Sequence, residues 1–138
     1  MIRDERGFTL AEVLVATVVI AIGLVAIVQG LSYATQGMET GRQQTTAIFL
    51  AEQRAEFIRS IAMTDFAHPT VAAGVTNEGY NTIANAANYR RVTTITNAPA
   101  PVDWKRVQVQ VFYRPVTTQG TLAQERQVDV VTVIARRQ

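Results

Sequence analysis

A single carboxylate, Glu12, lies inside a long apolar stretch that begins at Phe8 and carries no other charge as far as Met38. An unpaired charge in an apolar environment is costly, so a carboxylate at this position requires an explanation. Residues 8–28 would extend about 31 Å as a helix, close to the ~30 Å hydrocarbon core of a bilayer. The stretch therefore predicts a membrane-spanning helix, with Glu12 near one of its ends rather than at mid-membrane.

A cleaved secretory signal is the usual alternative for an apolar segment at an N-terminus. Such signals have a positively charged start before an apolar core of about 7–15 residues. Here Arg3 and Arg6 are offset by Asp4 and Glu5, and the apolar run is longer than in a signal. The segment therefore fits a membrane anchor better than an ordinary signal peptide.

The other residues that could support catalysis or metal binding are few and scattered. The only histidine, His68, precedes Pro69 at the start of a predicted loop, where we expect it to be exposed to solvent. Asp65 and Asp103 are expected to act as caps or turn residues. The absence of cysteine excludes disulfides and thiolate sites. We find no nucleophile–base pair, phosphate-binding loop or metal-ligand spacing, and therefore predict no enzyme activity, no catalytic residue, no metal and no cofactor.

Four basic residues form two pairs on neighbouring predicted strands, Arg90–Arg91 and Lys105–Arg106. If these strands pair, the four side chains could approach one another and contact the phosphates of DNA. Charged side chains on edge strands also keep sheets from associating with each other. Because the net charge is only +2, we favour the second interpretation and keep DNA binding as the lesser one.

One long helix, from about Phe8 to Ala62, would position these groups. Its second half is rich in Ala, Gln, Glu and Arg, and no proline occurs before Pro69. Apolar residues recur there at helical spacing, so this half should pack on a sheet with one face and contact water with the other. Glycines between Gly23 and Gly41 could loosen the helix at its middle. The residues expected on the buried face are Leu50, Phe57, Ile58 and Ile61.

Beyond Pro69 the chain changes to loop and strand patterns. Residues 70–88 are poor in large apolar side chains and predict an irregular loop. Strand patterns follow at Tyr89–Thr96, Asp103–Tyr113 and Gln127–Ala135, with short connections that favour antiparallel pairing. We therefore predict an α+β fold. In this fold a long N-terminal helix, membrane-embedded in its first half and amphipathic in its second, packs on a small antiparallel sheet of about three or more strands.

The sequence GFTLAEVLVA, from Gly7 to Ala16, resembles the N-terminal signature of the type IV pilin family, which includes the pseudopilins of type II secretion. Gly7 matches the glycine that ends the family's leader, and Phe8 matches the aromatic residue that becomes the new N-terminus. Glu12 matches the family's glutamate near the mature N-terminus. The resemblance implies that a prepilin peptidase cuts after Gly7 and methylates the Phe8 amine. It also implies that Glu12 pairs with the N-terminal amine of a neighbouring subunit during assembly.

The same resemblance divides the chain into a leader of residues 1–7, a hydrophobic transmembrane or filament-core helix of residues 8–36, and a soluble α+β head of residues 37–138. The leader is not net basic, the paired cysteines of many major pilins are absent, and the apolar helix has glycines but no proline, so the chain departs from the family in these three respects. The residues after Glu12 are most similar to V-type minor pilins and next to I-type minor pseudopilins.

A minor pilin would be a structural subunit, held in the inner membrane with its head in the periplasm and then assembled into a cell-surface pilus, at or near the tip. Its partners would be other pilin subunits, the prepilin peptidase and, before assembly, the lipid of the inner membrane. The near alternative is a minor pseudopilin in the periplasmic pseudopilus of a type II secretion system. An alternative of a different class is a plain single-pass membrane protein with a periplasmic binding domain.

Overall fold

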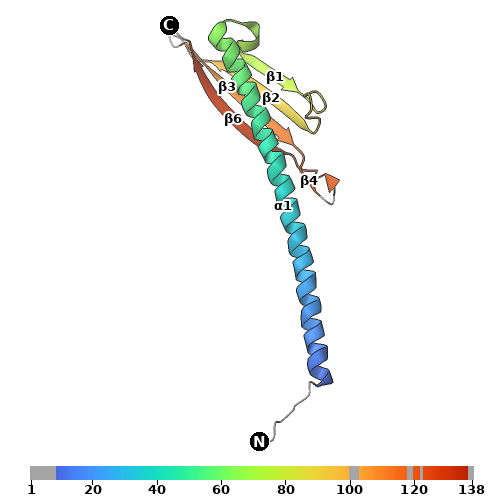
Figure 1. Ribbon diagram of the computed structural model, residues 1–138. Helices are drawn as coiled ribbons and strands as arrows, with labels where there is room; N and C mark the ends of the chain where they lie inside the picture. The colour runs from blue at the N-terminus through green and yellow to red at the C-terminus, as the bar shows by residue number, and fades with distance from the viewer. Residues whose placement is uncertain (1–8, 100–102, 118–119, 122, 137–138) are drawn as a thin grey trace, which may run out of the picture. The chain divides into compact units, whose positions relative to one another are not determined.

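The computed structural model describes residues 9–99, 103–117, 120–121 and 123–136 of the 138-residue chain (Figure 1). The chain divides into two compact units, Met1–Met38 and Glu39–Gln138. The first unit contains the N-terminal part of helix α1. The second unit contains the remainder of α1 and the sheet, so the predicted α+β fold is confirmed.

Helix α1 runs without interruption from Leu10 to Thr64. The helix continues through Gly23 and Gly41, so the loosening predicted between these two residues is not seen. In the first unit the side chains of α1 are exposed all round the helix, apart from the half-buried Gln36. This part of the helix therefore has no face that the described chain itself buries.

The sheet of the second unit has four antiparallel strands in the order β1-β2-β3-β6. A short 3-10 helix, η1 (Pro69–Val71), follows α1. Two very short strands, which follow β3 and precede β6 in the sequence, pair with each other as a separate two-stranded ribbon. The strands are β1 (Gly74–Glu78), β2 (Tyr89–Asn97), β3 (Trp104–Tyr113), β4 (Val116–Thr117), β5 (Gly120–Thr121) and β6 (Arg126–Ala135).

Three of these strands, β2, β3 and β6, coincide with the three predicted ones to within a residue at each end. Strand β1 was not predicted, because residues 70–88 were expected to form an irregular loop. Gly74 and Asn77 are poor strand formers, and most of the strand is exposed. Its backbone pairs with β2 nonetheless, with Val75 opposite Thr94 and Glu78 opposite Arg91. Tertiary pairing therefore determines this strand rather than local propensity.

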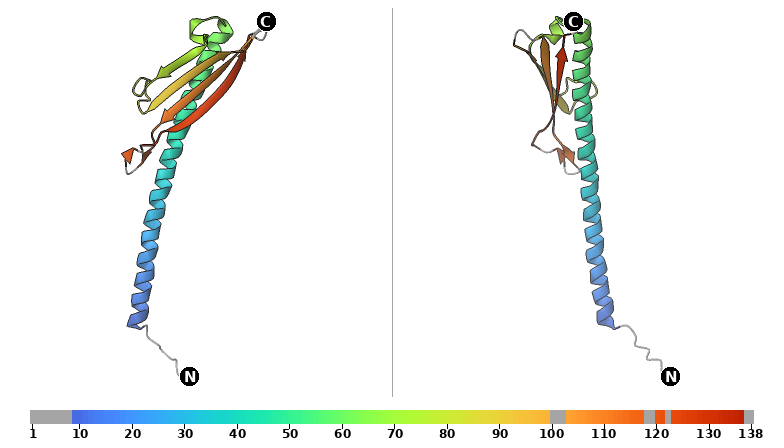
Figure 2. Two further views of the ribbon diagram at one scale, coloured as in Figure 1. Left: turned by 180° about the vertical axis from the view of Figure 1, so that it is seen from behind. Right: turned by 90° about the vertical axis from the view of Figure 1, so that its left-hand side faces the viewer.

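The core lies between the second half of α1 and one face of the sheet, as Figure 2 shows for this unit. Alternate residues of β3 point toward the helix, and Val107, Val109 and Val111 are fully buried. The helix contributes many small side chains to this interface, which lets its backbone approach the sheet closely. The buried helix residues are Ala47, Leu50, Ala51, Ala55, Ile58 and Ala62.

The predicted buried face of the helix was right for Leu50 and Ile58 but wrong for Phe57. Ile58 is fully buried, Ile61 is half-buried, and the side chain of Phe57 is 49% exposed. Neighbouring residues on an α-helix point about 100° apart, so the residue before Ile58 is turned toward the rim of the interface. Alanines occupy the positions of closest approach, where a phenylalanine would not fit.

Candidate functional site

The first turn of α1 holds Glu12 by a reciprocal set of hydrogen bonds with Thr9. The backbone N–H and the Oγ1 hydroxyl of Thr9 donate to Glu12 Oε2 at 2.9 and 3.0 Å, and the Glu12 N–H donates to Thr9 Oγ1 at 3.3 Å. This arrangement is a capping box, which satisfies backbone N–H groups that have no partner at the start of a helix. The Thr-x-x-Glu spacing of Thr9 and Glu12 is the sequence signal for this motif.

The capping box leaves part of the Glu12 carboxylate available. Both bonds from Thr9 end on Oε2, and among the described residues Oε1 accepts no hydrogen bond and no cation forms an ion pair with the group. Gly7 and Phe8, the predicted cleavage and methylation residues, lie outside the described residues. The structure therefore describes Glu12 of the predicted assembly site and not the other two.

The helix surface around Glu12 is apolar on every side. Large hydrophobic side chains from Leu10 to Val28 have exposed fractions between 49% and 83%. Within the described part of the chain, α1 is the one helix long and apolar enough to cross a membrane, by length and composition. Monomeric soluble proteins rarely expose an apolar surface of this extent, so this helix requires lipid or other helices around it.

Residues 2–28 match the model of the prokaryotic N-terminal methylation motif. This motif is a signature of membrane-anchored proteins whose N-terminus is processed, and it agrees with the apolar first part of α1, which the matched residues include. It supports a type IV pilin-like or pseudopilin protein, with a structural rather than an enzymatic role. Comparisons of the whole chain with curated proteins and with solved structures find no match.

The residues considered for catalysis form local structural contacts. His68 is half-buried rather than exposed as expected, because its Nδ1 accepts a hydrogen bond from the Thr70 N–H at 3.2 Å and caps η1. Asp65 caps a turn as predicted, with Oδ1 accepting from the Ala67 N–H at 2.9 Å. Among the described residues, no group of three or more His, Cys, Asp or Glu side chains could hold a metal ion.

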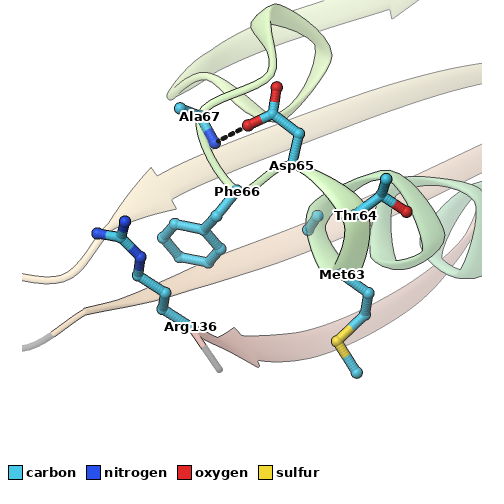
Figure 3. A pocket seen from close by; sticks show the side chains of 7 residues that line it. Met63, Thr64, Asp65, Phe66, Ala67 and Arg136 are labelled. Atoms are coloured by element: carbon cyan, nitrogen blue, oxygen red, sulfur yellow. Dashed lines mark hydrogen bonds between the residues drawn. The ribbon is translucent and has the colours of Figure 1, made fainter. Parts of the chain in front are cut away.

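Asp65 also lines a hollow of about 320 Å³ at the C-terminal end of α1 (Figure 3). Figure 3 shows its carboxylate directed at the Ala67 amide, while Phe66 and Arg136 line another part of the hollow. Arg136 forms an exposed ion pair with Asp103, with 3.3 Å between Nη1 and Oδ2. The polar groups here are thus engaged in local contacts rather than arranged for catalysis.

The four basic residues considered for DNA binding do not form a cluster. In the antiparallel register, Arg91 lies opposite Val111 at one end of the β2–β3 pair, and Lys105 lies opposite Asn97 at the other end. Strands β2 and β3 are also central in the sheet, so the expectation that these charges protect an edge strand was wrong. Both errors follow from pairing, because antiparallel order places the start of one strand beside the end of the next.

Arg91 is buried on the helix side of the sheet, with 7% of its surface exposed. Its Nε and Nη2 donate to the two oxygens of Glu78 at 2.6 and 2.8 Å, and its Nη1 donates to the Leu50 carbonyl at 3.1 Å. The hydrogen bonds from Arg91 lower the pKa of Glu78. Arg91 therefore connects β1, β2 and α1 within the core.

Arg90, the adjacent residue, points to the opposite face. Its guanidinium donates twice to Glu125, at 3.2 and 2.8 Å, and lies 3.7 Å from the centroid of the Phe112 ring. The Tyr80 hydroxyl donates to the same carboxylate at 2.8 Å. The bonds from Arg90, and next those from Tyr80, lower the pKa of Glu125 to about 2. No pattern in the sequence indicated this contact, since Glu125 lies in a loop.

Lys105 is buried, and its Nζ donates to the Val71 carbonyl at 2.7 Å and lies 4.8 Å from the centroid of the Phe66 ring. Of the four basic residues, Arg106 alone is exposed. The basic residues of β2 and β3 therefore act mainly within the fold, and they leave little of their charge for phosphate contacts.

Proposed function

We propose that this protein is a minor pilin, a structural subunit of a type IV pilus that is inserted in the inner membrane and assembled at or near the filament tip. The observation that supports this proposal most is the N-terminal methylation motif, together with a helix whose apolar side chains are exposed all round and whose one charged residue before Glu39 is Glu12. The head of residues 37–138 would lie in the periplasm until assembly. A minor pseudopilin remains the near alternative, and genomic neighbours separate the two.

Processing would create the charge that Glu12 needs. Cleavage after Gly7 exposes the amine of Phe8, and α-amino groups with a pKa near 7.7–8.0 are mostly cationic at neutral pH. In an apolar filament core this cation requires a counter-charge. Glu12 can serve two purposes at once, because Oε2 caps its own helix through Thr9 while Oε1 is available to the amine of a neighbouring subunit.

The test expresses variants in a host that lacks the wild-type copy and compares membrane and sheared-filament fractions by immunoblot. Glu12→Leu should be inserted and cleaved normally, but its incorporation into filaments should fall about a hundredfold, because the neighbouring amine loses its counter-charge. Glu12→Asp should be intermediate. Glu52→Leu, which changes an exposed carboxylate in the second unit, is the matched control and should assemble normally.

Two further variants separate the steps. Gly7→Val should remain an uncleaved membrane protein, and the mass of the wild-type protein should show loss of Met1–Gly7 and gain of one methyl group. An unprocessed wild-type chain would instead favour the plain single-pass membrane protein. Thr9→Val removes the hydroxyl of the capping box but keeps the charge, so it should assemble far better than Glu12→Leu. Equal defects in these two variants would mean that Glu12 acts only as a helix cap.

A further inference from the structure

Strand β1 forms one edge of the sheet, and its outer side is unpaired (Figure 1). It pairs with β2, and its backbone makes no hydrogen bond to any other part of the chain that the structure describes. Four of its five residues are exposed, and the exposed fraction of Val75 is 68%. The unpaired N–H and C=O groups of an edge strand are the groups with which a further strand pairs. This edge therefore suits an extended polypeptide.

A hollow of about 480 Å³ lies beside this edge, where residues of β1, β2 and α1 and of the segment around η1 meet. A Cβ atom added at Gly74, the first residue of β1, would meet no other atom within 4 Å, so the edge is open there. Among the described residues that line the hollow, Arg54 of α1 is the one with a charged side chain. The hollow therefore combines an open strand edge with one positive charge on the helix side of the sheet.

No carboxylate in the described part of the chain binds the Arg54 guanidinium. The side chain is half-buried, its guanidinium carbon lies 5.5 Å from the Phe57 ring centroid, and its Nε is buried without a hydrogen-bond partner. The pKa of Glu78 is lowered first by hydrogen bonds from Arg91 and last by the charge of Arg54, and both Glu78 oxygens accept from Arg91. A buried N–H without a partner is uncommon in folded proteins. Arg54 is therefore available to an acceptor from outside the chain.

We propose that β1 binds an extended segment of a partner protein by strand addition, with an acidic side chain of that segment at Arg54. Main-chain hydrogen bonds supply affinity in this mode of recognition, and alternate side chains supply specificity, because they point to opposite faces of the sheet. A carboxylate on the helix side would form a charge-assisted hydrogen bond with Arg54. A second copy of this chain is less suitable, because Asp129, the acid of its open edge strand β6, already accepts from Gln108 at 2.8 Å. The inference concerns the second unit alone and does not depend on membrane insertion.

The experiment titrates fluorescein-labelled octapeptides with the full-length chain in a neutral detergent and measures fluorescence anisotropy. The peptides alternate threonine and valine, and one central position carries glutamate, glutamine or lysine. A hydrogen bond to a charged group contributes about a tenfold difference in affinity. The glutamate peptide should therefore bind about tenfold more tightly than the glutamine peptide, and the lysine peptide should bind most weakly. Arg54→Gln should remove the preference for glutamate.

Methylation of the peptide amides tests the main-chain pairing. The N–H groups of successive residues in a strand point to opposite sides, so N-methylation at odd-numbered or at even-numbered positions blocks opposite edges of the peptide. One of these two glutamate peptides should bind like the parent peptide, and the other should not bind. Equal effects of the two methylation patterns would overturn strand addition. This comparison uses the wild-type chain, so it remains informative even if a substitution of Arg54 disturbs folding.

A matched control and two further outcomes complete the test. Arg59→Gln changes an exposed arginine of α1 that is paired with Glu56, and it should keep the preference for glutamate. Equal binding of the three peptides to the wild-type chain, or no binding of any of them, would overturn the site while leaving the pilin assignment intact. If Arg54→Gln converts a dimer into a monomer in sedimentation equilibrium, a second copy occupies the edge and the partner-protein proposal is wrong.

Discussion

The two parts of α1 share one helical geometry but place their apolar residues in opposite environments. In the first unit, Val, Ile and Leu occupy every side of the helix and are exposed. In the second unit, the buried residues lie on one side and most are alanines, while Glu52 and Glu56 lie on the exposed side. The first part therefore depends on lipid or other subunits, whereas the second part has its own core.

This difference means that folding and assembly can be damaged separately. A side chain removed from the second part leaves a cavity between helix and sheet, which costs stability in the isolated molecule. A side chain removed from the first part changes a surface that the folded chain itself does not bury. The comparison can therefore be tested by making the same substitution in each part.

The largest effect is expected for Ile58→Ala, which empties a fully buried position against the sheet. We expect the free energy of unfolding to fall by about 2–5 kcal/mol. The measurement is urea unfolding of the full-length chain in a neutral detergent, followed by the fluorescence of Trp104, the single tryptophan. The matched control is Ile22→Ala in the first part, where the side chain is 66% exposed and the loss should be below about 0.5 kcal/mol. Similar losses in the two variants would contradict the comparison.

A smaller effect is expected from acid, and it too belongs to the second unit. Contacts with Arg90 and Tyr80 hold the pKa of Glu125 at about 2, and contacts with Arg91 lower the pKa of Glu78. A carboxylate whose pKa is lower in the folded state stabilises the fold above its ordinary pKa, near 4.3. This contribution is lost as the pH falls from about 5 toward 2.

The urea midpoint of the second unit should therefore decrease over this range of pH. Glu125→Gln should make the decrease shallower, because the substituted side chain no longer titrates. Glu52→Gln, which alters an exposed carboxylate on α1, is the matched control and should keep the slope of the wild-type protein. An unchanged slope in Glu125→Gln would show that the contact with Arg90 does not stabilise the fold in solution.

The sequence predicted those elements in which local pattern and tertiary structure agree. The long apolar stretch and the amphipathic run after it indicated α1, and the alternation of Val107, Val109 and Val111 indicated β3. The prediction failed where partners distant in sequence determine the structure. Because β1 was not predicted, Glu78 could not be identified as the partner of Arg91, and Arg91 was taken for a surface residue.

In the candidate site, too, features that depend on a local pattern could be predicted, and features that depend on residues distant in sequence could not. The roles predicted for Gly7, Phe8 and Glu12 depended on a short motif; the match to residues 2–28 covers this motif, and the three roles stay predictions. The local bond between Thr9 and Glu12 could also have been predicted from spacing alone. A hollow of about 330 Å³ in the second unit, lined among others by Arg42 and Arg114, could not have been predicted, because these residues are far apart in sequence and line one hollow only through the packing of α1 on the sheet.

The smallest effect is expected for Phe57→Ala, which tests where the buried face of α1 ends. Half of this side chain is exposed, and its ring centroid lies 5.5 Å from the Arg54 guanidinium carbon. A cation–π contact at an exposed site contributes about 0.5–1 kcal/mol, so the loss of unfolding free energy should stay below about 1 kcal/mol. Phe49→Ala, at a position that is 62% exposed, should cost less still in the same urea measurement. A loss of about 3 kcal/mol or more for Phe57→Ala would identify Phe57 as a core residue. The buried face of α1 would then extend further round the helix than the structure shows.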